Sequence, residues 1–148
     1  MNAAETLPHA AAPVSGAPRA ILRLEGALVL VAAVAAYAQH SGHWGLFLLL
    51  FLVPDLSMLG YLAGARMGAV TYNIVHSYVL PLSIGLAGIG SAQPALIDVA
   101  LIWIAHIGLD RMLGYGLKYG SAFGHTHLGL LGRARPVSGD RTESPARG

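Results

Sequence analysis

The fold is decided by the stretch WIAHIGLDRMLGYGLKYGSAFGHTHLG, which spans Trp103 to Gly129. It begins as the end of an apolar helix and continues as a polar, glycine-rich segment. His106 and Asp110 are four residues apart, so on a helix they lie one above the other on a single face. Further ionisable residues follow in the same stretch: Arg111, Lys118, His125 and His127.

The composition around this stretch is that of a membrane protein. The chain has 148 residues, enough for one domain, and 55% of them are hydrophobic while only 11% are charged. A soluble domain needs more charge than this to cover its surface. The chain has no cysteine, which excludes disulfides, thiolate metal sites and thiol catalysis. The net charge of +2 comes from the chain ends, so we expect the lipid bilayer, and no nucleic acid, as a partner.

Four apolar segments are expected to be helices, at about residues 20–39, 44–63, 67–90 and 94–115. Each is close to the ~20 residues that cross ~30 Å of hydrocarbon. Their short connections force neighbouring helices to be antiparallel. The expected fold is therefore all-α, an integral membrane bundle of four antiparallel transmembrane helices.

The ends of the chain differ from this core. Residues 1–18 are rich in alanine and proline with small polar residues, and residues 133–148 read RARPVSGDRTESPARG, which predicts two disordered tails. The transmembrane domain is then residues 19–132, including an ordered cytoplasmic extension. Tyr115, Tyr119 and Phe123 follow each other at a four-residue spacing, which predicts that the fourth helix continues into this extension.

Basic residues set the orientation. They lie at the two ends of the apolar region and in the second connection, and the first and third connections contain none: Arg19, Arg23, Arg66, Arg111, Lys118, Arg133 and Arg135. The positive-inside rule then places both termini in the cytoplasm. Arg66, Arg111 and Lys118 are candidates for contact with anionic head groups, and Glu25 is expected to form a surface ion pair with a nearby arginine.

Several polar residues fall at one depth in the apolar segments. At 1.5 Å per residue, Asp55, His76 and His106 lie about 12–13 Å below the cytoplasmic end of their helices. A charge at such a depth costs on the order of 3 kcal/mol, so a shared cluster is favoured over three separate groups. The expected polar cluster has six members: Asp55, Tyr72, Asn73, His76, His106 and Asp110.

The cluster has two interpretations. Histidine nitrogens and carboxylate oxygens are ligands of zinc or manganese, and the candidate ligands are Asp55, His76, His106 and His127. Asp110 would then orient His106 instead of binding the metal. Alternatively, the same groups form hydrogen bonds that only fix helix packing. Pro54 and Pro81 should bend their helices and free carbonyls that neighbouring side chains must satisfy.

The chain also resembles a known family. LRLEG, PDLSMLGY, YNIVHSYVLP and AHIGLDRMLGYGLKYGSAFGHTHLG, one in each apolar segment, resemble the uncharacterised bacterial membrane proteins called domain of unknown function 4260. The resemblance runs from about Leu22 to Gly132, and it departs at His125, where the family usually has an acidic residue. It implies a small multi-helix protein of the bacterial inner membrane and brings no established activity.

A second similarity concerns the pattern alone. A Pro-Asp pair, a buried histidine and HxxxD followed by a glycine are similar to the membrane-bound metal-dependent hydrolases related to phospholipase C-like enzymes. That group's HR and THS elements are not found here, and THLG is a partial match. This similarity implies a class of reaction only.

Three functions are compatible with these observations. The sequence favours a non-catalytic membrane subunit, acting as a homo-oligomer or with a membrane protein partner, whose polar cluster fixes helix packing. The first alternative is a metal-assisted hydrolase of a lipid-derived substrate. The second is a small proton-coupled carrier, which would use the same groups as a proton relay. No internal repeat relates the two halves, which counts against a carrier.

The topology can be tested with reporter fusions. Fusions after Gly42 and Ala92 should report the outside of the membrane and a fusion after Arg66 the inside, because the basic residues lie on one side only. An inside signal at Gly42 would overturn the whole arrangement.

Overall fold

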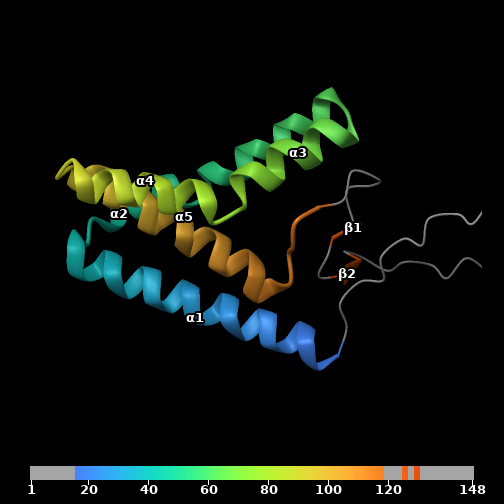
Figure 1. The fold of residues 1–148 in the computed structure, drawn as a ribbon, viewed down its shortest axis with the longest axis horizontal. Helices are drawn as coiled ribbons and strands as arrows, with labels where there is room; N and C mark the ends of the chain where they lie inside the picture. The colour runs from blue at the N-terminus through green and yellow to red at the C-terminus, as the bar shows by residue number, and fades with distance from the viewer. Residues whose placement is uncertain (1–15, 119–124, 127–128, 131–148) are drawn as a thin grey trace, which may run out of the picture.

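The computed structural model describes residues 16–118, 125–126 and 129–130 (Figure 1). Apart from two short strands, regular structure in this part of the chain is helical, so the expected all-α class is confirmed. The elements are, in order, α1 (Ala17–His40), α2 (Trp44–Phe51), η1 (Val53–Ala63), α3 (Ala65–Val75), α4 (Val79–Gly90), α5 (Pro94–Leu113), β1 (His125–Thr126) and β2 (Gly129–Leu130). The two strands pair antiparallel with each other. Most residues of the two predicted tails lie outside the described residues, and α1 begins at Ala17, just before the predicted boundary.

The second and third predicted helices are both interrupted. Residues 44–63 form an α-helix and then a 3-10 helix, and Pro54 stands in the first turn of the latter. Residues 65–90 form α3 and α4, separated by His76, Ser77 and Tyr78. Pro81 lies in the first turn of α4, where its ring would clash with the carbonyl four residues earlier, at Ser77, if the helix were continuous. The prolines therefore end helices as well as bend them.

Helix α5 is the centre of the arrangement. It packs along α1, with Arg23 contacting Met112 at one end and His40 contacting Asp98 at the other, so these two helices run in opposite directions. Helix α4 packs along the first part of α5, and η1 and α3 lie together as a separate hairpin (Figure 1). Gly64, with a φ of 114°, makes the turn of this hairpin.

Small residues permit these contacts. A Cβ on Gly60 would meet the Thr71 side chain, and one on Gly68 would meet the Tyr61 ring, so both glycines allow η1 and α3 to pack closely. Gly108 lies against the backbone of α1 at Leu30. Gly64 has open space around it and serves the turn instead.

The outer surface of the helices is apolar. Many large hydrophobic side chains are exposed, among them Leu48, Leu62 and Val79 at 73%, 87% and 73%. Three helical segments are long and apolar enough to cross a membrane, by length and composition: Ala17–His40, Trp44–Ala63 and Ala65–Gly90. The fourth predicted segment is α5, which also carries Asp98, Asp110 and Arg111.

The predicted continuation of the fourth helix is wrong. Helix α5 ends at Leu113, and Gly114 adopts a left-handed conformation with a φ of 94°. The Gly114 N–H donates to the Arg111 carbonyl and the Tyr115 N–H to the Asp110 carbonyl, which is the Schellman pattern that ends helices. The glycine at this position therefore outweighs the aromatic spacing that suggested a longer helix.

The contact between α1 and α5 can be tested at Gly108. A Cβ there would lie 2.7 Å from the Leu30 backbone nitrogen and 3.0 Å from the Gly26 carbonyl oxygen. Gly108→Ala should therefore push the helices apart and lower the free energy of unfolding in detergent by about 1–3 kcal/mol. The control is Gly90→Ala, whose Cβ meets nothing within 4 Å and should leave stability unchanged or slightly raised. Equal thermal stability of both variants would contradict the close packing.

Candidate metal centre

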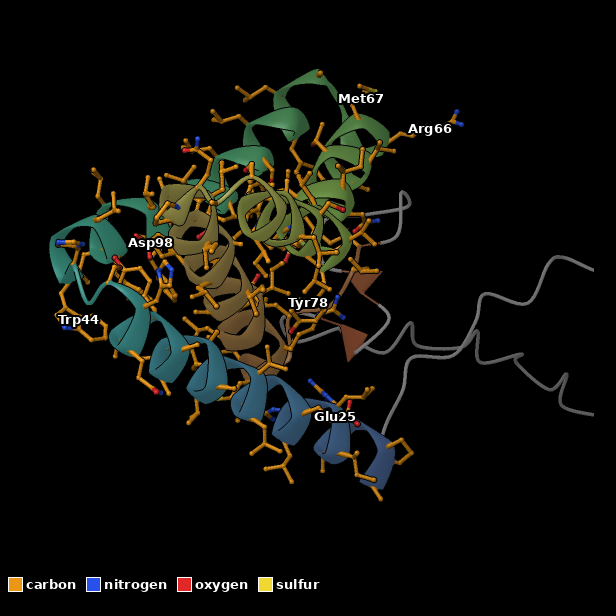
Figure 2. The ribbon with its side chains drawn as sticks, turned by 60° about the vertical axis from the view of Figure 1, so that its left-hand side comes forward. Glu25, Trp44, Arg66, Met67, Tyr78 and Asp98 are labelled. Carbon is orange, nitrogen blue, oxygen red and sulfur yellow. The ribbon has the colours of Figure 1, made fainter. Side chains whose placement is uncertain are left out.

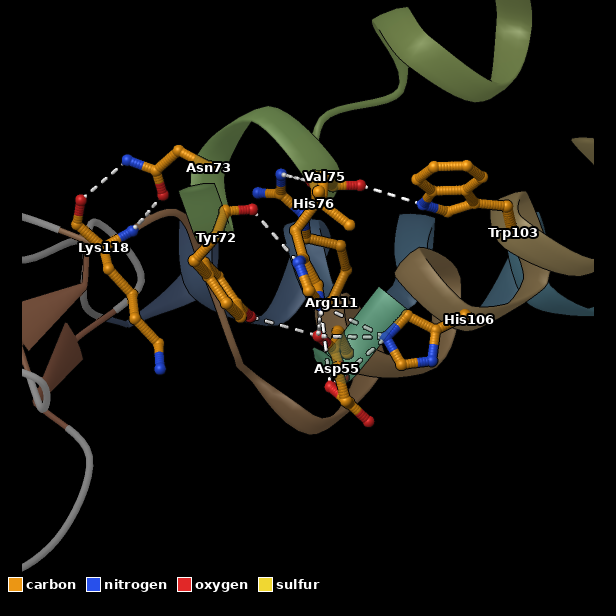
Figure 3. Close-up of polar contacts among 10 residues, drawn as sticks. Asp55, Tyr72, Asn73, Val75, His76, Trp103, His106, Arg111 and Lys118 are labelled. Atoms are coloured by element: carbon orange, nitrogen blue, oxygen red, sulfur yellow. Dashed lines mark hydrogen bonds and ion pairs between the residues drawn. The ribbon is translucent and has the colours of Figure 1, made fainter. Parts of the chain in front are cut away.

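Four side chains from three elements bring one ligand atom each to a common point (Figure 3). They are Asp55, His76, His106 and Asp110, and the four atoms all lie within 4.8 Å of one another. The two Nε2 atoms of His76 and His106 are 3.2 Å apart. Both histidines are buried, at 2% exposure. The convergence expected for Asp55, His76 and His106 from their depths is confirmed.

The carboxylates complete this group. Asp55 Oδ1 is 3.7 Å from His76 Nε2 and 3.6 Å from His106 Nε2. Asp110 Oδ2 is 3.5 Å from the same atom of His76 and 3.9 Å from that of His106. A tetrahedral zinc ion, with bonds of about 2.0–2.1 Å, needs ligand atoms roughly 3.3–3.4 Å apart. The nitrogen–nitrogen and nitrogen–oxygen separations are 3.2–3.9 Å and all four atoms lie within 4.8 Å, so shifts of up to about an ångström would close them around an ion.

The helix interruptions put two of these residues in place. Asp55 follows Pro54 in the first turn of η1, and His76 is the residue at which α3 ends. Carbonyls freed at the second interruption accept hydrogen bonds from α5, as expected for such a site: the Trp103 indole N–H donates to Val75 at 2.9 Å, and the Arg111 guanidinium reaches the His76 carbonyl at 3.5 Å. The side chains of α5 therefore hold the end of α3 against the cluster.

Hydrogen bonding fixes the protonation pattern of His76. Its Nδ1 is 3.1 Å from the Tyr72 carbonyl oxygen, and since a carbonyl only accepts, Nδ1 carries the proton. The neutral ring then presents a lone pair at Nε2, facing His106 and both carboxylates. This is the arrangement of a metal-binding histidine whose other nitrogen is anchored. His106 lacks such an anchor, because its Nδ1 is buried without a hydrogen-bond partner.

Tyr72 contacts two members of the cluster, His76 and Asp110. Its ring stacks on His76 with centroids 3.8 Å apart, and its hydroxyl donates to Asp110 Oδ2 at 3.1 Å. It therefore holds both a ring and a carboxylate of the centre. Tyr72 and Asn73 were expected in the cluster, and only Tyr72 contacts it.

The role expected for Asp110 changes. Asp110 was expected to orient His106 through Nδ1. It approaches Nε2 instead, the same atom that faces Asp55 and His76. Residues one turn apart on a helix can meet through either nitrogen, and the ring orientation decides which. Asp110 thus joins the possible ligands. His127, the other predicted ligand, lies outside the described residues.

The predicted anion contacts fall in different places. Arg66 is exposed at the far end of the η1–α3 hairpin and points away from the cluster (Figure 2). Arg111 is half-buried beside the end of α3. Lys118 does not extend outward as expected. Its side chain is buried at 5% exposure, with the ammonium 4.3 Å from the centroid of the Tyr72 ring.

Asn73 explains the position of Lys118. Its amide nitrogen donates to the Lys118 carbonyl at 2.8 Å, and the Lys118 N–H donates to the Asn73 side-chain oxygen at 2.7 Å. This two-way bond holds the chain after α5 against α3. Burial lowers the pKa of Lys118 below its usual range, and the charges of Asp110 and Asp55 oppose that shift. The ammonium therefore lies within the electrostatic reach of the cluster.

One buried pair was missed from the sequence. Asp98, in the first turns of α5, is buried at 7% exposure, and its Oδ1 is 2.9 Å from His40 Nδ1 at the end of α1 (Figure 2). A signal was present, because an aspartate close to the start of an apolar helix needs a partner and His40 belongs to the connection at that same end. This pair joins α1 to α5 far from the four-residue cluster.

Fold and site define a small all-helical protein with membrane-length apolar segments and a buried histidine–aspartate cluster. The chain belongs to the family described as Domain of unknown function (DUF4260), which matches residues 19–131. Comparison with curated proteins and with solved structures finds no match. The match to the family model confirms the resemblance that the sequence motifs indicate.

The bond between Asn73 and Lys118 can be tested by limited proteolysis. In the wild type, trypsin should spare Lys118 because its backbone N–H and carbonyl are both bound. Asn73→Ala removes two hydrogen bonds, each worth about 1 kcal/mol, so cleavage after Lys118 should rise at least roughly fivefold. Ser77→Ala is the control, since the Ser77 hydroxyl donates to Ile74 within its own segment. Rapid cleavage after Lys118 in the wild type would contradict the anchored position.

Proposed function

We propose that the protein is a membrane-embedded, metal-dependent hydrolase of a lipid-derived substrate, with four transmembrane segments and both termini in the cytoplasm. The observation that carries the proposal is the approach of two imidazole nitrogens and two carboxylate oxygens to one point, all within 4.8 Å of one another. The apolar outer surface and the three membrane-length segments support the location. The similarity of the sequence pattern to membrane-bound hydrolases supports the class of reaction.

Charge balance supports a divalent metal. Two neutral histidines and two ionised carboxylates carry a charge of −2, which a divalent cation neutralises. Without a cation, neutral His106 can donate from Nε2 to His76 Nε2 and Tyr72 donates to Asp110, but the two carboxylates would still lie close together, with only the charges of Arg111 and Lys118 outside the cluster acting on them. Mixed nitrogen and oxygen ligands suit zinc or manganese better than magnesium or calcium, which prefer oxygen.

The exposures of the side chains suggest different roles for the four residues. The side chains of His76, His106 and Asp110 are 3%, 2% and 17% exposed, whereas that of Asp55 is 42% exposed. The two buried histidines and the half-buried Asp110 make three protein ligands and leave one position for water, which is the usual composition of a catalytic zinc site. A bound zinc ion lowers the pKa of such a water toward neutrality. Asp55, on the accessible side, is then the group that accepts the proton of the water.

Hydrolysis follows from these roles. Asp55 takes one proton from the water, and the water oxygen forms a bond to the carbonyl carbon or phosphorus of the substrate. The bond to the leaving oxygen breaks, and that oxygen receives the proton from Asp55. Lys118 and Arg111 supply positive charge for an anionic substrate near the cluster.

The non-catalytic subunit favoured by the sequence is the second candidate. It is supported by the way the cluster joins η1, α3 and α5, since a set of polar contacts among three elements is also what helix packing uses. The subunit needs no metal, and it would act as a homo-oligomer or with a membrane protein partner. Metal content therefore separates the two candidates.

Metal analysis of detergent-purified protein that has never met a chelator is the decisive experiment. The wild type should carry about one zinc or manganese ion per chain. His76→Ala and His106→Ala should each lose it, because each removes a ligand. His40→Ala is the matched control: it breaks the buried pair with Asp98, which costs stability without touching the cluster. A metal-free wild type that gains no thermal stability from added zinc or manganese would reject the metal centre.

Activity adds a second criterion. Metal-loaded protein should release hydrolysis products from vesicles of bacterial lipids, detected by mass spectrometry. Asp55→Asn should slow the release by about 10²–10⁴-fold, the usual effect of a general base. A stoichiometric metal with no difference between wild type and Asp55→Asn would assign the metal a structural role and favour the subunit.

A further inference from the structure

An apolar cavity of about 310 Å³ lies between the same segments that carry the cluster. Its walls come from the α2–η1 segment, the end of α3 and the middle of α5. They include Val53, Pro54, Val75, Val99, Ile102 and Trp103. The lining is almost entirely hydrocarbon. This volume is at the lower end of the range of ligand pockets.

The cavity and the cluster share their walls. Pro54 precedes Asp55, and Val75 precedes His76. Trp103 is one helical turn from His106 and donates its indole N–H to the Val75 carbonyl at 2.9 Å. Every segment that supplies a possible ligand therefore also supplies an apolar wall, and Asp55 and His76 each directly follow a residue that lines the cavity.

The opposite side of the cluster is cationic. The Tyr72 ring stacks on His76 at 3.8 Å, and the Lys118 ammonium lies 4.3 Å from the centroid of the same ring. Since His76 covers one face of Tyr72, the ammonium lies over the other face. Figure 3 shows this order, with Lys118 on one side, the histidines in the middle and Trp103 on the far side. Apolar wall, ligand group and cation thus follow one another in a line.

We propose that the cavity binds the acyl chain of an anionic lipid, with its ester at the cluster and its charged head group toward Lys118. This assignment rests on the proposed hydrolase function, and it adds which part of the substrate binds where. An amphiphile has the same order of chemistry, hydrocarbon, ester and anion, as the line of groups in the protein. A soluble anionic substrate has no hydrocarbon chain that could fill the apolar cavity.

Binding of the chain can be measured through Trp103. The protein has two tryptophans, so Trp44→Phe leaves Trp103 as the single fluorophore. A fatty acid brominated at mid-chain, added to the protein in detergent micelles, should quench Trp103 saturably at one molecule per chain. Val99→Phe narrows the cavity and should weaken this binding at least tenfold. Val53→Phe, at a cavity residue that is 46% exposed, gives the same test if Val99→Phe does not fold.

Val79→Phe is the matched control, because it makes the same change at a residue that is 73% exposed on α4. It should bind the probe within twofold of the parent. Quenching that never saturates, or that is equal in the parent, Val99→Phe and Val53→Phe, would overturn the proposal. Metal content is measured on the same samples. Saturable quenching in metal-free protein would reject the hydrolase and keep the lipid site. Metal-bound protein that shows no saturable quenching would keep the metal centre and reject the lipid site.

Discussion

The arrangement depends on two helix interruptions that bring polar side chains from separate segments to one place. In an uninterrupted helix every backbone N–H and carbonyl in the apolar region is satisfied internally, and polar side chains have to find partners alone. Here Pro54 and Pro81 prevent continuity, and the residues beside the interruptions, Asp55 and His76, become the ligand candidates. The cost of the interruption is offset by side chains of α5, which bond the freed carbonyls.

Helix α5 can serve this purpose because its other face is fixed. Gly108 and Gly26 let α1 approach closely at one end, and the His40–Asp98 pair holds the two helices at the other. Between them, Tyr37, Ile102 and Ala105 form the buried core. The face of α5 with His106 and Asp110 is therefore presented to η1 and α3 by a rigid pair of helices, which is what a site with sub-ångström requirements needs.

Part of this cluster can be predicted from the sequence, and part depends on details of the local structure. The shared level of Asp55, His76 and His106 follows approximately from the segment boundaries and a common rise per residue, and the 3-10 conformation of η1 lengthens the distance from Ala63 to Asp55 to about 16 Å. The role of Asp110 does not follow, because it depends on the rotation of the His106 ring. The burial of Lys118 does not follow from the aromatic spacing after Leu113, because α5 ends at Gly114 and the Lys118 backbone is bound by Asn73. The Asp98–His40 pair joins residues 58 positions apart, so it depends on which helices pack together.

The 3-10 conformation of η1 has a consequence for length. A 3-10 helix rises about 2.0 Å per residue against 1.5 Å in an α-helix, so the 11 residues of η1 extend roughly 22 Å instead of about 16 Å. With the 8 residues of α2, the segment extends about 34 Å, several ångströms more than an all-α segment with the same number of residues. Winding η1 into an α-helix would shorten it and rotate Asp55 relative to its neighbours. The position of one carboxylate is thus linked to the length of the apolar segment that carries it.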